Sequence, residues 1–322
     1  MASLLSVENL QVQFQTKKGI NTAVDGVSFS VEKGRILGIV GESGCGKSVT
    51  SMSILQLLGS NARISGGSIK LDGKELIGLP EKEMCRIRGN DIAMIFQDPM
   101  TALNPTLTIG TQLMEPIMLH QNCGKKEAWT RAVDVLKRVG IAAPEKRMKE
   151  YPHQLSGGMR QRVMIAMAVS CEPRLLIADE PITALDVTIQ AQILELMCEL
   201  REKMGTAIML ITHDMGVVAE TADDVLVLYA GKAVEYGSIE DIFERPKHPY
   251  TQGLLNSIPR LDEDVELLNT IEGTVPAPDA MPAGCRFAPR CPYGKDRCMK
   301  EKPGVYHAGN SLVSCFRYEG EK

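Results

Sequence analysis

Apolar and polar residues alternate from Ser6 to Glu32, with Val12, Phe14 and Phe29 among the apolar positions. A period of two residues is typical of half-buried strands, so this stretch predicts antiparallel strands. Short apolar runs follow later and predict buried strands of an α/β sheet. They cover residues 36–40, 92–96, 175–178, 207–211 and 225–229, and the last run is expected to close the sheet as a hairpin with residues 233–236.

Between Thr101 and Tyr151 the spacing of apolar residues changes to that of a helix. Ala128, Ala132 and Leu136 recur every fourth position, which places them on one helix face. No strand pattern interrupts this stretch. We therefore predict an all-helical insert, at about residues 101–158, within an α/β core.

The composition narrows the range of partners. The chain has 322 residues, 44% of them hydrophobic, and a net charge of −4. This is ample for a large core, and the lack of a global basic field argues against nucleic acid as the main partner. The first residues lack an export signal, and no apolar run is long enough to cross a bilayer. We expect a cytosolic protein, or one held at a membrane by a partner.

A glycine-rich segment follows the first apolar run and leads into a helical pattern. Such a loop turns its backbone N–H groups around a phosphate chain at the positive end of the helix. Lys47 is expected to reach the terminal phosphates, and Ser48 to offer its hydroxyl to Mg²⁺. The segment predicts a P-loop that binds a nucleoside triphosphate through Gly41, Ser43, Gly44, Cys45, Gly46, Lys47, Ser48 and Val49.

Cys45 lies at the N-terminus of the helix that follows this loop, beside Lys47. Both features lower the pKa of a thiol. The sequence therefore predicts a reactive thiol at Cys45, whose alkylation inactivates the protein and which bound nucleoside triphosphate protects.

Polar side chains stand at the ends of three other apolar runs. Asp179 and Glu180 end the third run, where we expect Asp179 to position Mg²⁺ and Glu180 to polarise the attacking water. Gln97 ends the second run and either contacts Mg²⁺ or the water, or caps the next segment. His213 follows the fourth run and either orients the water and the γ-phosphate or faces solvent.

Two further places have both a functional and a structural interpretation. Phe14 either stacks on an adenine ring or belongs to the core of the antiparallel strands. Ser156, Gly157 and Gly158 open a predicted helix that continues to Val169. They form either a second anion site or a good N-cap alone.

Four of the nine cysteines crowd the sequence beyond residue 284, namely Cys285, Cys291, Cys298 and Cys315. Without an export signal, clustered thiols indicate metal rather than disulfides. Four thiolates suit an iron–sulfur cluster or structural zinc, and the lack of a Cys-x2-Cys pair favours the cluster. Reduced cysteines packed as small apolar groups are the alternative.

The order of these motifs resembles that of an ABC-transporter ATPase over residues 5 to about 255. The residues that carry the resemblance are the P-loop, Gln97, Leu155-Ser156-Gly157-Gly158-Met159-Arg160-Gln161, Asp179-Glu180, Ala184-Leu185-Asp186 and His213. It implies a head-to-tail dimer with two ATP molecules, each between one P-loop and the other subunit's Ser156 and Gly158. Phe14 would be the adenine platform, Gln97 the lever to a membrane partner, and Asp186 a contact across the dimer.

Two C-terminal segments, 248–255 and 284–292, narrow the resemblance to the ATPase subunits of bacterial oligopeptide and dipeptide ABC importers. In that family the C-terminal cysteines hold a [4Fe–4S] cluster. The resemblance also implies a related second ATPase, two transmembrane permease subunits, and an extracytoplasmic binding protein reached through them. It implies a peripheral protein at the cytoplasmic face of the inner membrane. Ile182 departs from the family, which commonly has a hydroxyl residue there, but we do not infer a dead site.

We therefore expect an α/β fold with a RecA-like P-loop NTPase core, an antiparallel β subdomain, an inserted helical subdomain and a small cysteine-rich module. The expected domains are an ABC nucleotide-binding domain at 1–256 and the C-terminal module at 257–322. Importers of nickel or another small solute are the alternative within the family. A soluble ABC ATPase acting on ribosomes or DNA is less consistent with the sequence, because the chain has one cassette and no long coiled coil. A small-molecule kinase is also less consistent, because it would leave the motif at 155–161 unexplained.

Overall fold

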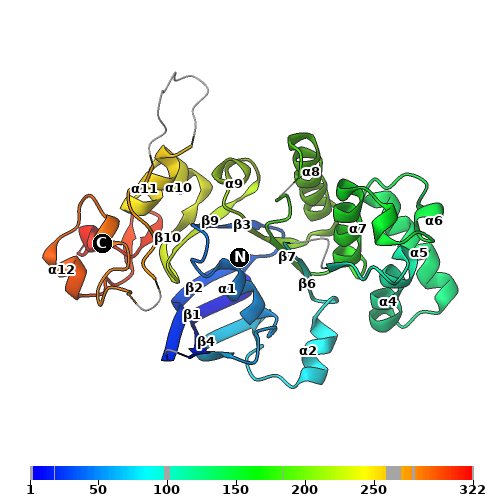
Figure 1. Ribbon diagram of the computed structural model, residues 1–322, viewed down its shortest axis with the longest axis horizontal. Coiled ribbons are helices and arrows are strands. Elements are labelled where there is room, and N and C mark those ends of the chain that lie inside the picture. Colours follow the sequence, from blue (N-terminus) through cyan, green and yellow to red (C-terminus); the bar gives the residue numbers. More distant parts are fainter. Residues whose placement is uncertain are drawn as a thin grey trace.

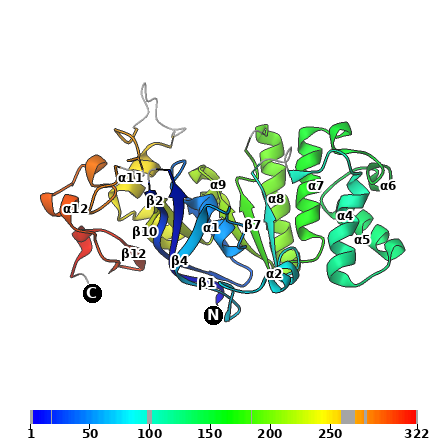
Figure 2. The ribbon, with the colours of Figure 1, turned by 60° about the horizontal axis from the view of Figure 1, so that its bottom comes forward.

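Two β-sheets form the centre of the molecule, one of four strands and one of eight (Figure 1). The computed structural model describes residues 3–17, 19–97, 102–183, 185–258, 270–277 and 280–320. A group of helices lies at one end of the sheets and the C-terminal segment at the other, an arrangement that Figure 2 shows from a second direction.

The smaller sheet is antiparallel, with strand order β2-β1-β4-β5. Its strands are β1 (Ser3–Thr16), β2 (Gly19–Glu32), β4 (Ala62–Leu71) and β5 (Lys74–Glu75). Val7, Val12 and Val27 are buried on its inner face, so the alternating pattern is confirmed. At the turn between β4 and β5, Asp72 and Gly73 have φ of 49° and 80°, the positive values that a tight hairpin turn needs.

The larger sheet has the order β11-β12-β10-β9-β3-β8-β7-β6, and the pairs from β9 to β6 are parallel. Its strands are β3 (Ile36–Val40), β6 (Ile92–Ile95), β7 (Leu175–Asp179), β8 (Ala207–Ile211), β9 (Asp224–Tyr229), β10 (Lys232–Ser238), β11 (Tyr306–Ala308) and β12 (Ser311–Val313). Every residue of β3, β7 and β8 is buried, because both faces of the sheet are covered.

The two faces of this sheet belong to different cores. On β8, Met209 and Ile211 pack with the antiparallel sheet, whereas Ile208 and Leu210 pack with the helices on the opposite side. Figure 1 shows α8 and α9 on that opposite side. This layering accounts for the continuous apolar runs, since both alternating sets of side chains are buried.

The prediction that the β9–β10 hairpin closes the sheet is wrong. Strand β12 pairs with β10 through Glu235 and Val313 and through Tyr236 and Leu312, and β11 lies outside β12. Each of the two added strands is three residues long, which is too short to give an alternating signal in the sequence.

The helical insert is confirmed, since all regular elements described between residues 102 and 158 are helical. Ala128, Ala132 and Leu136 of the insert are fully buried. The helices of the whole chain are α1 (Lys47–Ile54), α2 (Glu81–Ile87), α4 (Ile109–Gln121), α5 (Lys125–Arg138), α6 (Pro144–Arg147), α7 (Gly157–Val169), α8 (Val187–Met204), α9 (Met215–Thr221), α10 (Ile239–Glu244), α11 (Pro249–Asn256) and α12 (Asp296–Lys300). Short 3-10 turns occur at η1 (Pro152–Gln154), η2 (Ala288–Arg290) and η3 (Phe316–Tyr318).

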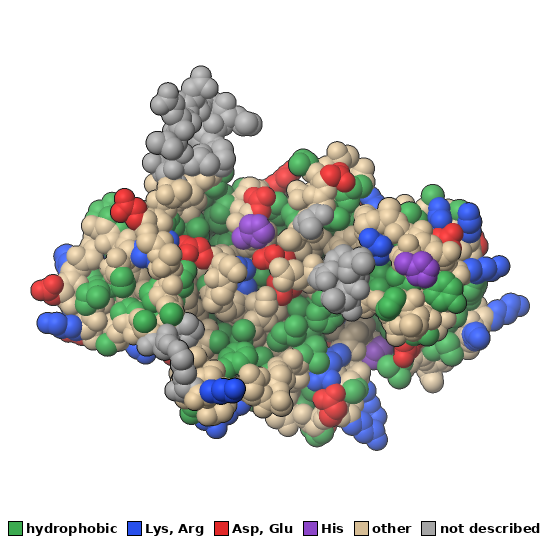
Figure 3. Space-filling model, in the orientation of Figure 1, with side chains coloured by type: hydrophobic (Ala, Val, Ile, Leu, Met, Phe, Trp, Pro, Cys, Tyr) green, Lys and Arg blue, Asp and Glu red, His purple; other side chains and the backbone are tan. Residues whose placement is uncertain are grey.

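The outer surface carries charges of both signs. Figure 3 shows acidic and basic side chains interspersed over one face of the molecule, in keeping with the small net charge of −4. None of the described helices combines the length and apolar character that a membrane span requires.

Candidate functional site

The P-loop and the residues predicted to act on Mg²⁺ and the attacking water follow four adjacent parallel strands, β3, β8, β7 and β6. The carboxyl ends of these strands lie at one edge of the sheet. The P-loop follows β3, the acidic pair follows β7, and Gln97 and His213 come after β6 and β8. Because ligands of parallel α/β sheets bind at this edge, the topology places all of these groups around one candidate site.

The glycine loop after β3 has the backbone that a phosphate cradle needs. Gly41, Gly44 and Gly46 have φ of 150°, 76° and 102°, which glycine adopts readily. A Cβ atom at Gly41 would lie 2.1 Å from the carbonyl oxygen of Leu228, so the loop also needs the absence of a side chain there. Ser43, Gly44 and Ser48 are exposed, and the helix predicted after the loop is α1, which begins at Lys47.

The Lys47 side chain is folded back into this loop. Its ammonium donates hydrogen bonds to the carbonyl oxygens of Gly41, at 2.6 Å, and Glu42, at 3.3 Å. Only 6% of Lys47 is exposed. The charge is thereby held inside the curve of the loop, where it can neutralise phosphate oxygens.

Asp179 offers a carboxylate oxygen suited to a metal ion. Asp179 is 4% exposed, and its Oδ1 atom has no hydrogen-bond partner among the described residues. Burial raises the pKa of Asp179, and a hydrogen bond from Ser48 opposes the shift. A buried oxygen without a partner, beside a serine hydroxyl, fits the oxygen ligands that Mg²⁺ prefers.

Three side chains meet on the carboxylate of Glu180. Gln97 Nε2 lies 2.9 Å from Oε2, Thr183 Oγ1 lies 3.1 Å from Oε2, and His213 Nδ1 lies 3.4 Å from Oε1. The Glu180 backbone has a φ of 48°, and its N–H donates to the carbonyl oxygen of Ile211. The structure thus brings Gln97, Glu180 and His213 together. Thr183 was missed, although it stands one turn after Glu180 in the sequence.

The motif around Ser156 forms a separate surface. Ser156 caps α7 by accepting a hydrogen bond from the Met159 N–H at 3.3 Å, and Asp186 caps α8 in the same way. Ser156, Gly157, Gly158 and Asp186 line one cavity of about 490 Å³. Figures 1 and 2 place α7 beside the helical insert and α1 between the two sheets. The Ser156 motif, at the start of α7, and the P-loop, at the start of α1, therefore lie in different parts of one chain.

Phe14 lies on β1 and is half-buried against the core of the antiparallel sheet. Val49 is likewise half-buried on that core. Part of each side chain is therefore open to solvent, and a role in nucleotide binding stays a prediction for both.

The prediction of a reactive Cys45 is wrong. The Cys45 side chain is 1% exposed and packs in the core beneath the loop. Burial raises the pKa of the thiol and outweighs the opposing effect of Lys47. The Cys45 N–H donates to the carbonyl oxygen of Glu42 at 3.2 Å, and a role of this backbone in phosphate binding stays a prediction.

This burial predicts slow chemistry at Cys45. We expect iodoacetamide to label the exposed Cys85 in the native protein, and Cys45 only after unfolding, with or without ATP. Peptide mass spectrometry after timed alkylation measures both rates. Equal labelling rates for Cys45 and Cys85 in the native protein would contradict the buried position.

The C-terminal cysteines gather in one place. Cys285, Cys291, Cys298 and Cys315 all line one cavity of about 60 Å³. Burial raises the pKa of Cys285 to about 11. In the part of the chain that the structure describes, no three Cys, His, Asp or Glu side chains are arranged to hold a metal ion.

Two residues near the P-loop were not assigned a role from the sequence. Tyr250 OH accepts a hydrogen bond from the Glu42 N–H at 2.9 Å, and Arg290 pairs with the Glu42 carboxylate at 2.9 Å. Each is more than 200 positions from Glu42, so only the folded chain reveals the contact.

Comparisons with known families agree with this arrangement. A family model described as "ABC transporter" matches residues 24–183. A second, described as "Oligopeptide/dipeptide transporter, C-terminal region", matches residues 234–298.

Among curated proteins, the oligopeptide transport ATP-binding protein AppD of Bacillus subtilis is 56% identical, over 100% of this chain and 98% of its own length. The dipeptide transport ATP-binding protein DppD of the same organism is 54% identical, over 98% of this chain and 95% of its own. The oligopeptide transport ATP-binding protein OppD of Escherichia coli is 51% identical, over 98% and 93%.

Among solved structures, the dimeric ATP-binding cassette MJ0796 bound to ADP and Pi is similar to this chain, with a TM-score of 0.66 and 27% identity. It is matched over 98% of its length and covers 73% of this chain. The expected cassette fold is therefore confirmed, with ATP hydrolysis as the activity of the family. The chain belongs to the ABC-transporter ATPases, in the group of oligopeptide and dipeptide transport ATP-binding proteins.

Proposed function

We infer that this chain is the ATP-hydrolysing subunit of a membrane transporter that imports di- or oligopeptides. The observation that carries the activity is the meeting of Gln97, Thr183 and His213 on Glu180, at the sheet edge that also bears the P-loop. The cargo class is supported by relatives named for oligopeptide or dipeptide transport, which align over almost the whole chain.

In this proposal the loop from Gly41 to Ser48, together with Val49, binds the phosphates of ATP. Lys47 neutralises their charge from its place inside the loop. Phe14 stacks on the adenine ring with the part of its side chain that is open to solvent.

Ser48 and Asp179 would hold Mg²⁺, with Gln97 at its side, because Asp179 Oδ1 lacks a partner among the described residues. The ion would shield the charge of the transferring phosphoryl group. Glu180 accepts the proton of the attacking water, and Gln97, Thr183 and His213 fix the direction of its carboxylate.

Ser156, Gly157, Gly158 and Asp186 act on the nucleotide of a second ATPase subunit. The support is that Ser156 and Gly157 are exposed at the start of α7, which offers free N–H groups, and that Asp186 lines the same cavity. A head-to-tail pair would complete each ATP site, and the partner is a related subunit of the same family.

The helical insert would transmit nucleotide binding to the membrane. The support is that Gln97 bonds to the Glu180 carboxylate and stands just before the insert in the sequence, so that a change at Glu180 would be felt at Gln97. The partners of the insert are two transmembrane permease subunits, and the binding protein outside the membrane acts only through them. The chain would then lie peripherally at the cytoplasmic face of the inner membrane.

For the C-terminal cysteines we propose a [4Fe–4S] cluster, with zinc as the alternative. All four thiols line one cavity, and a cluster is bound through sulfurs spaced around it, whereas zinc needs four ligands converging on one ion. The lack of a Cys-x2-Cys pair in the sequence favours the cluster over zinc. These residues belong to a C-terminal unit at 257–322, beside a cassette at 1–256.

Protein purified without oxygen should be brown and contain about four iron atoms per chain. Metal analysis and the visible absorption spectrum test this together, and Cys291→Ser should lower the iron content while Cys85→Ser should not. Colourless protein with one zinc per chain would contradict the cluster.

The transport function is tested by co-purification from the native membrane, followed by uptake into vesicles. We expect permease subunits and a second ATPase to co-purify with this chain, and the reconstituted complex to take up labelled peptides only with ATP. Uptake of nickel or another small solute without peptide uptake would contradict the proposed cargo.

A further inference from the structure

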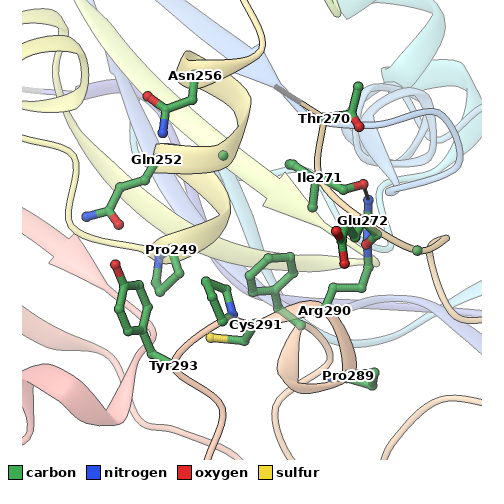
Figure 4. Close-up of a pocket in the computed structure, with 14 residues that line it drawn as sticks. Pro249, Gln252, Asn256, Thr270, Ile271, Glu272, Pro289, Arg290, Cys291 and Tyr293 are labelled. Carbon is green, nitrogen blue, oxygen red and sulfur yellow. Dashed lines mark hydrogen bonds between the residues drawn. The ribbon is translucent and has the colours of Figure 1, made fainter. Parts of the chain in front are cut away.

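One C-terminal segment, residues 285–291, touches both the cysteine-lined cavity and the nucleotide loop. Cys285 and Cys291 at its two ends line the cavity, and each has an arginine as its neighbour within the segment. In Figure 4 the neighbours Arg290 and Cys291 extend to different sides of the segment, and Arg290 reaches toward Ile271 and Glu272. Arg290 and Cys291 also line a larger cavity of about 630 Å³ beside α11.

The Arg290 guanidinium is fixed by hydrogen bonds from all three of its nitrogen atoms. Nη1 lies 2.9 and 3.0 Å from the two carboxylate oxygens of Glu42. Nε donates to the carbonyl oxygen of Glu272 at 2.9 Å, and Nη2 to that of Ile271 at 3.1 Å. The Arg290 side chain is 6% exposed and the Glu42 side chain 29%, so the guanidinium end of this ion pair is shielded from water and the carboxylate end is partly open to it. The two hydrogen bonds from Nη1 to the carboxylate fix the geometry of the pair.

Glu42 is the second residue of the P-loop, and its backbone is held as firmly as its side chain. The Glu42 N–H donates to Tyr250 OH, and the Glu42 carbonyl oxygen accepts from Lys47 Nζ. Tyr250 is fully buried, and its ring packs against Phe287 of the segment, with ring centres 5.4 Å apart. The position of the loop that carries Lys47 therefore depends on the C-terminal segment.

Arg286 makes a second connection. Its guanidinium donates to the Ala230 carbonyl oxygen and lies 3.0 Å from Asp25 Oδ2. Next to Ala230, the Gly231 N–H donates to the carbonyl oxygen of Cys45 in the P-loop at 2.8 Å. The segment thus reaches the loop at Glu42 and at Cys45.

We propose that Arg290 is a positioning residue for the nucleotide loop, and that through it the state of the cysteine-lined cavity is coupled to ATP affinity. The inference rests on the proposed binding of ATP at the P-loop. Arg290 is the chain neighbour of Cys291, and close-packed parts of a protein transmit a displacement, so a shift of Cys291 would move Arg290. Coupling of this kind is reciprocal. If a change of state in the cavity alters the ATP affinity by some factor, bound ATP shifts the equilibrium between the two states of the cavity by the same factor.

The first test is a double-mutant cycle on the intact chain, with ATP dissociation constants from calorimetry. Arg290→Ala and Glu42→Ala should each weaken ATP binding about tenfold, and the double variant should be no weaker than the weaker single variant. The KM for ATP should rise with little change in kcat, because the Glu180 cluster is untouched. Arg138→Ala is the matched control, since Arg138 pairs with Glu172 on the surface, away from the loop and from the cysteine-lined cavity, and it should bind ATP normally.

The second test addresses the cavity. Cys291→Ser should weaken ATP binding severalfold when Arg290 is present and have no further effect in the Arg290→Ala background, whereas Cys85→Ser should have none in either. Additive effects of Cys291→Ser and Arg290→Ala would overturn the coupling.

For every variant, the unfolding temperature is also measured without nucleotide. If Arg290→Ala does not fold, Arg290→Gln replaces it. A lower unfolding temperature with an unchanged ATP dissociation constant would make Arg290 purely structural and overturn the proposal. Failure of the unmodified chain to bind ATP would instead overturn the proposed function.

Discussion

Glu180→Gln should lose nearly all ATP turnover while it still binds ATP within a few-fold of the unmodified chain. The amide keeps the size of the side chain but cannot accept a proton from water, and general-base catalysis contributes roughly 10²- to 10⁴-fold. Phosphate release and nucleotide binding, measured on the same preparation, separate the two properties. The loss should appear in kcat rather than in KM.

A matched control is available at Glu172. This glutamate also has a left-handed backbone, with a φ of 53°, and pairs with Arg138 on the surface. Glu172→Gln should leave turnover unchanged. Near-normal hydrolysis by Glu180→Gln would remove Glu180 from the role of base and leave its contacts with Gln97 and His213 as structural ones.

Ser156→Arg has the second largest expected effect. In the proposed head-to-tail pair, a long charged side chain at the exposed start of α7 would occupy the space of the partner's phosphates, and the change would also remove the cap on the Met159 N–H. We expect ATP hydrolysis by the assembled complex to fall by about two orders of magnitude or more, while ATP binding to the isolated chain stays within a few-fold.

Thr108→Arg separates the two consequences of that change. Thr108 caps α4 by accepting from the Thr111 N–H at 3.3 Å, the same distance as in the Ser156 cap. Its replacement removes an equivalent cap, which stabilises a helix by about 1 kcal/mol, without touching the cavity at Ser156. An equal loss of hydrolysis in both variants would mean that the Ser156 effect comes from helix stability alone.

The core of the site could be predicted from the sequence because each of its parts is local. The glycine loop, the acidic pair and the residues after the apolar runs stand at the ends of strands, and parallel strands end at one edge. The contacts of Gln97 and His213 with Glu180 could not be predicted from the sequence alone. They depend on the order of the strands in the sheet, which brings these side chains together from neighbouring strands.

Cys45 shows where local reasoning fails. A helix start and a neighbouring lysine both favour a thiolate, and the sequence contains both. The side chain nevertheless packs under the loop at 1% exposure, and the cost of burying a charge exceeds these local effects. Burial depends on the strands of both sheets, which are distant in the sequence.

The C-terminal segment shows a different limit. Strands β11 and β12 extend the large sheet although each is too short to give a pattern, and Arg290 reaches Glu42 across 248 positions. The sequence predicts a cysteine-rich module here, and it does not show that residues of this module pair with β10 of the large sheet and with Glu42 of the nucleotide loop. These long-range contacts are strand pairing, hydrogen bonds and an ion pair, and their partners come together only in the folded chain.

The most direct test of the whole account is photolabelling of the assembled membrane complex by an ATP analogue with its reactive group on the γ-phosphate. In this chain, the account predicts label in peptides with residues 41–48 and in peptides with residues 156–158, the second set only when both ATPase subunits are present. Label confined to residues 41–48 in the fully assembled complex would contradict an ATP site shared between two subunits.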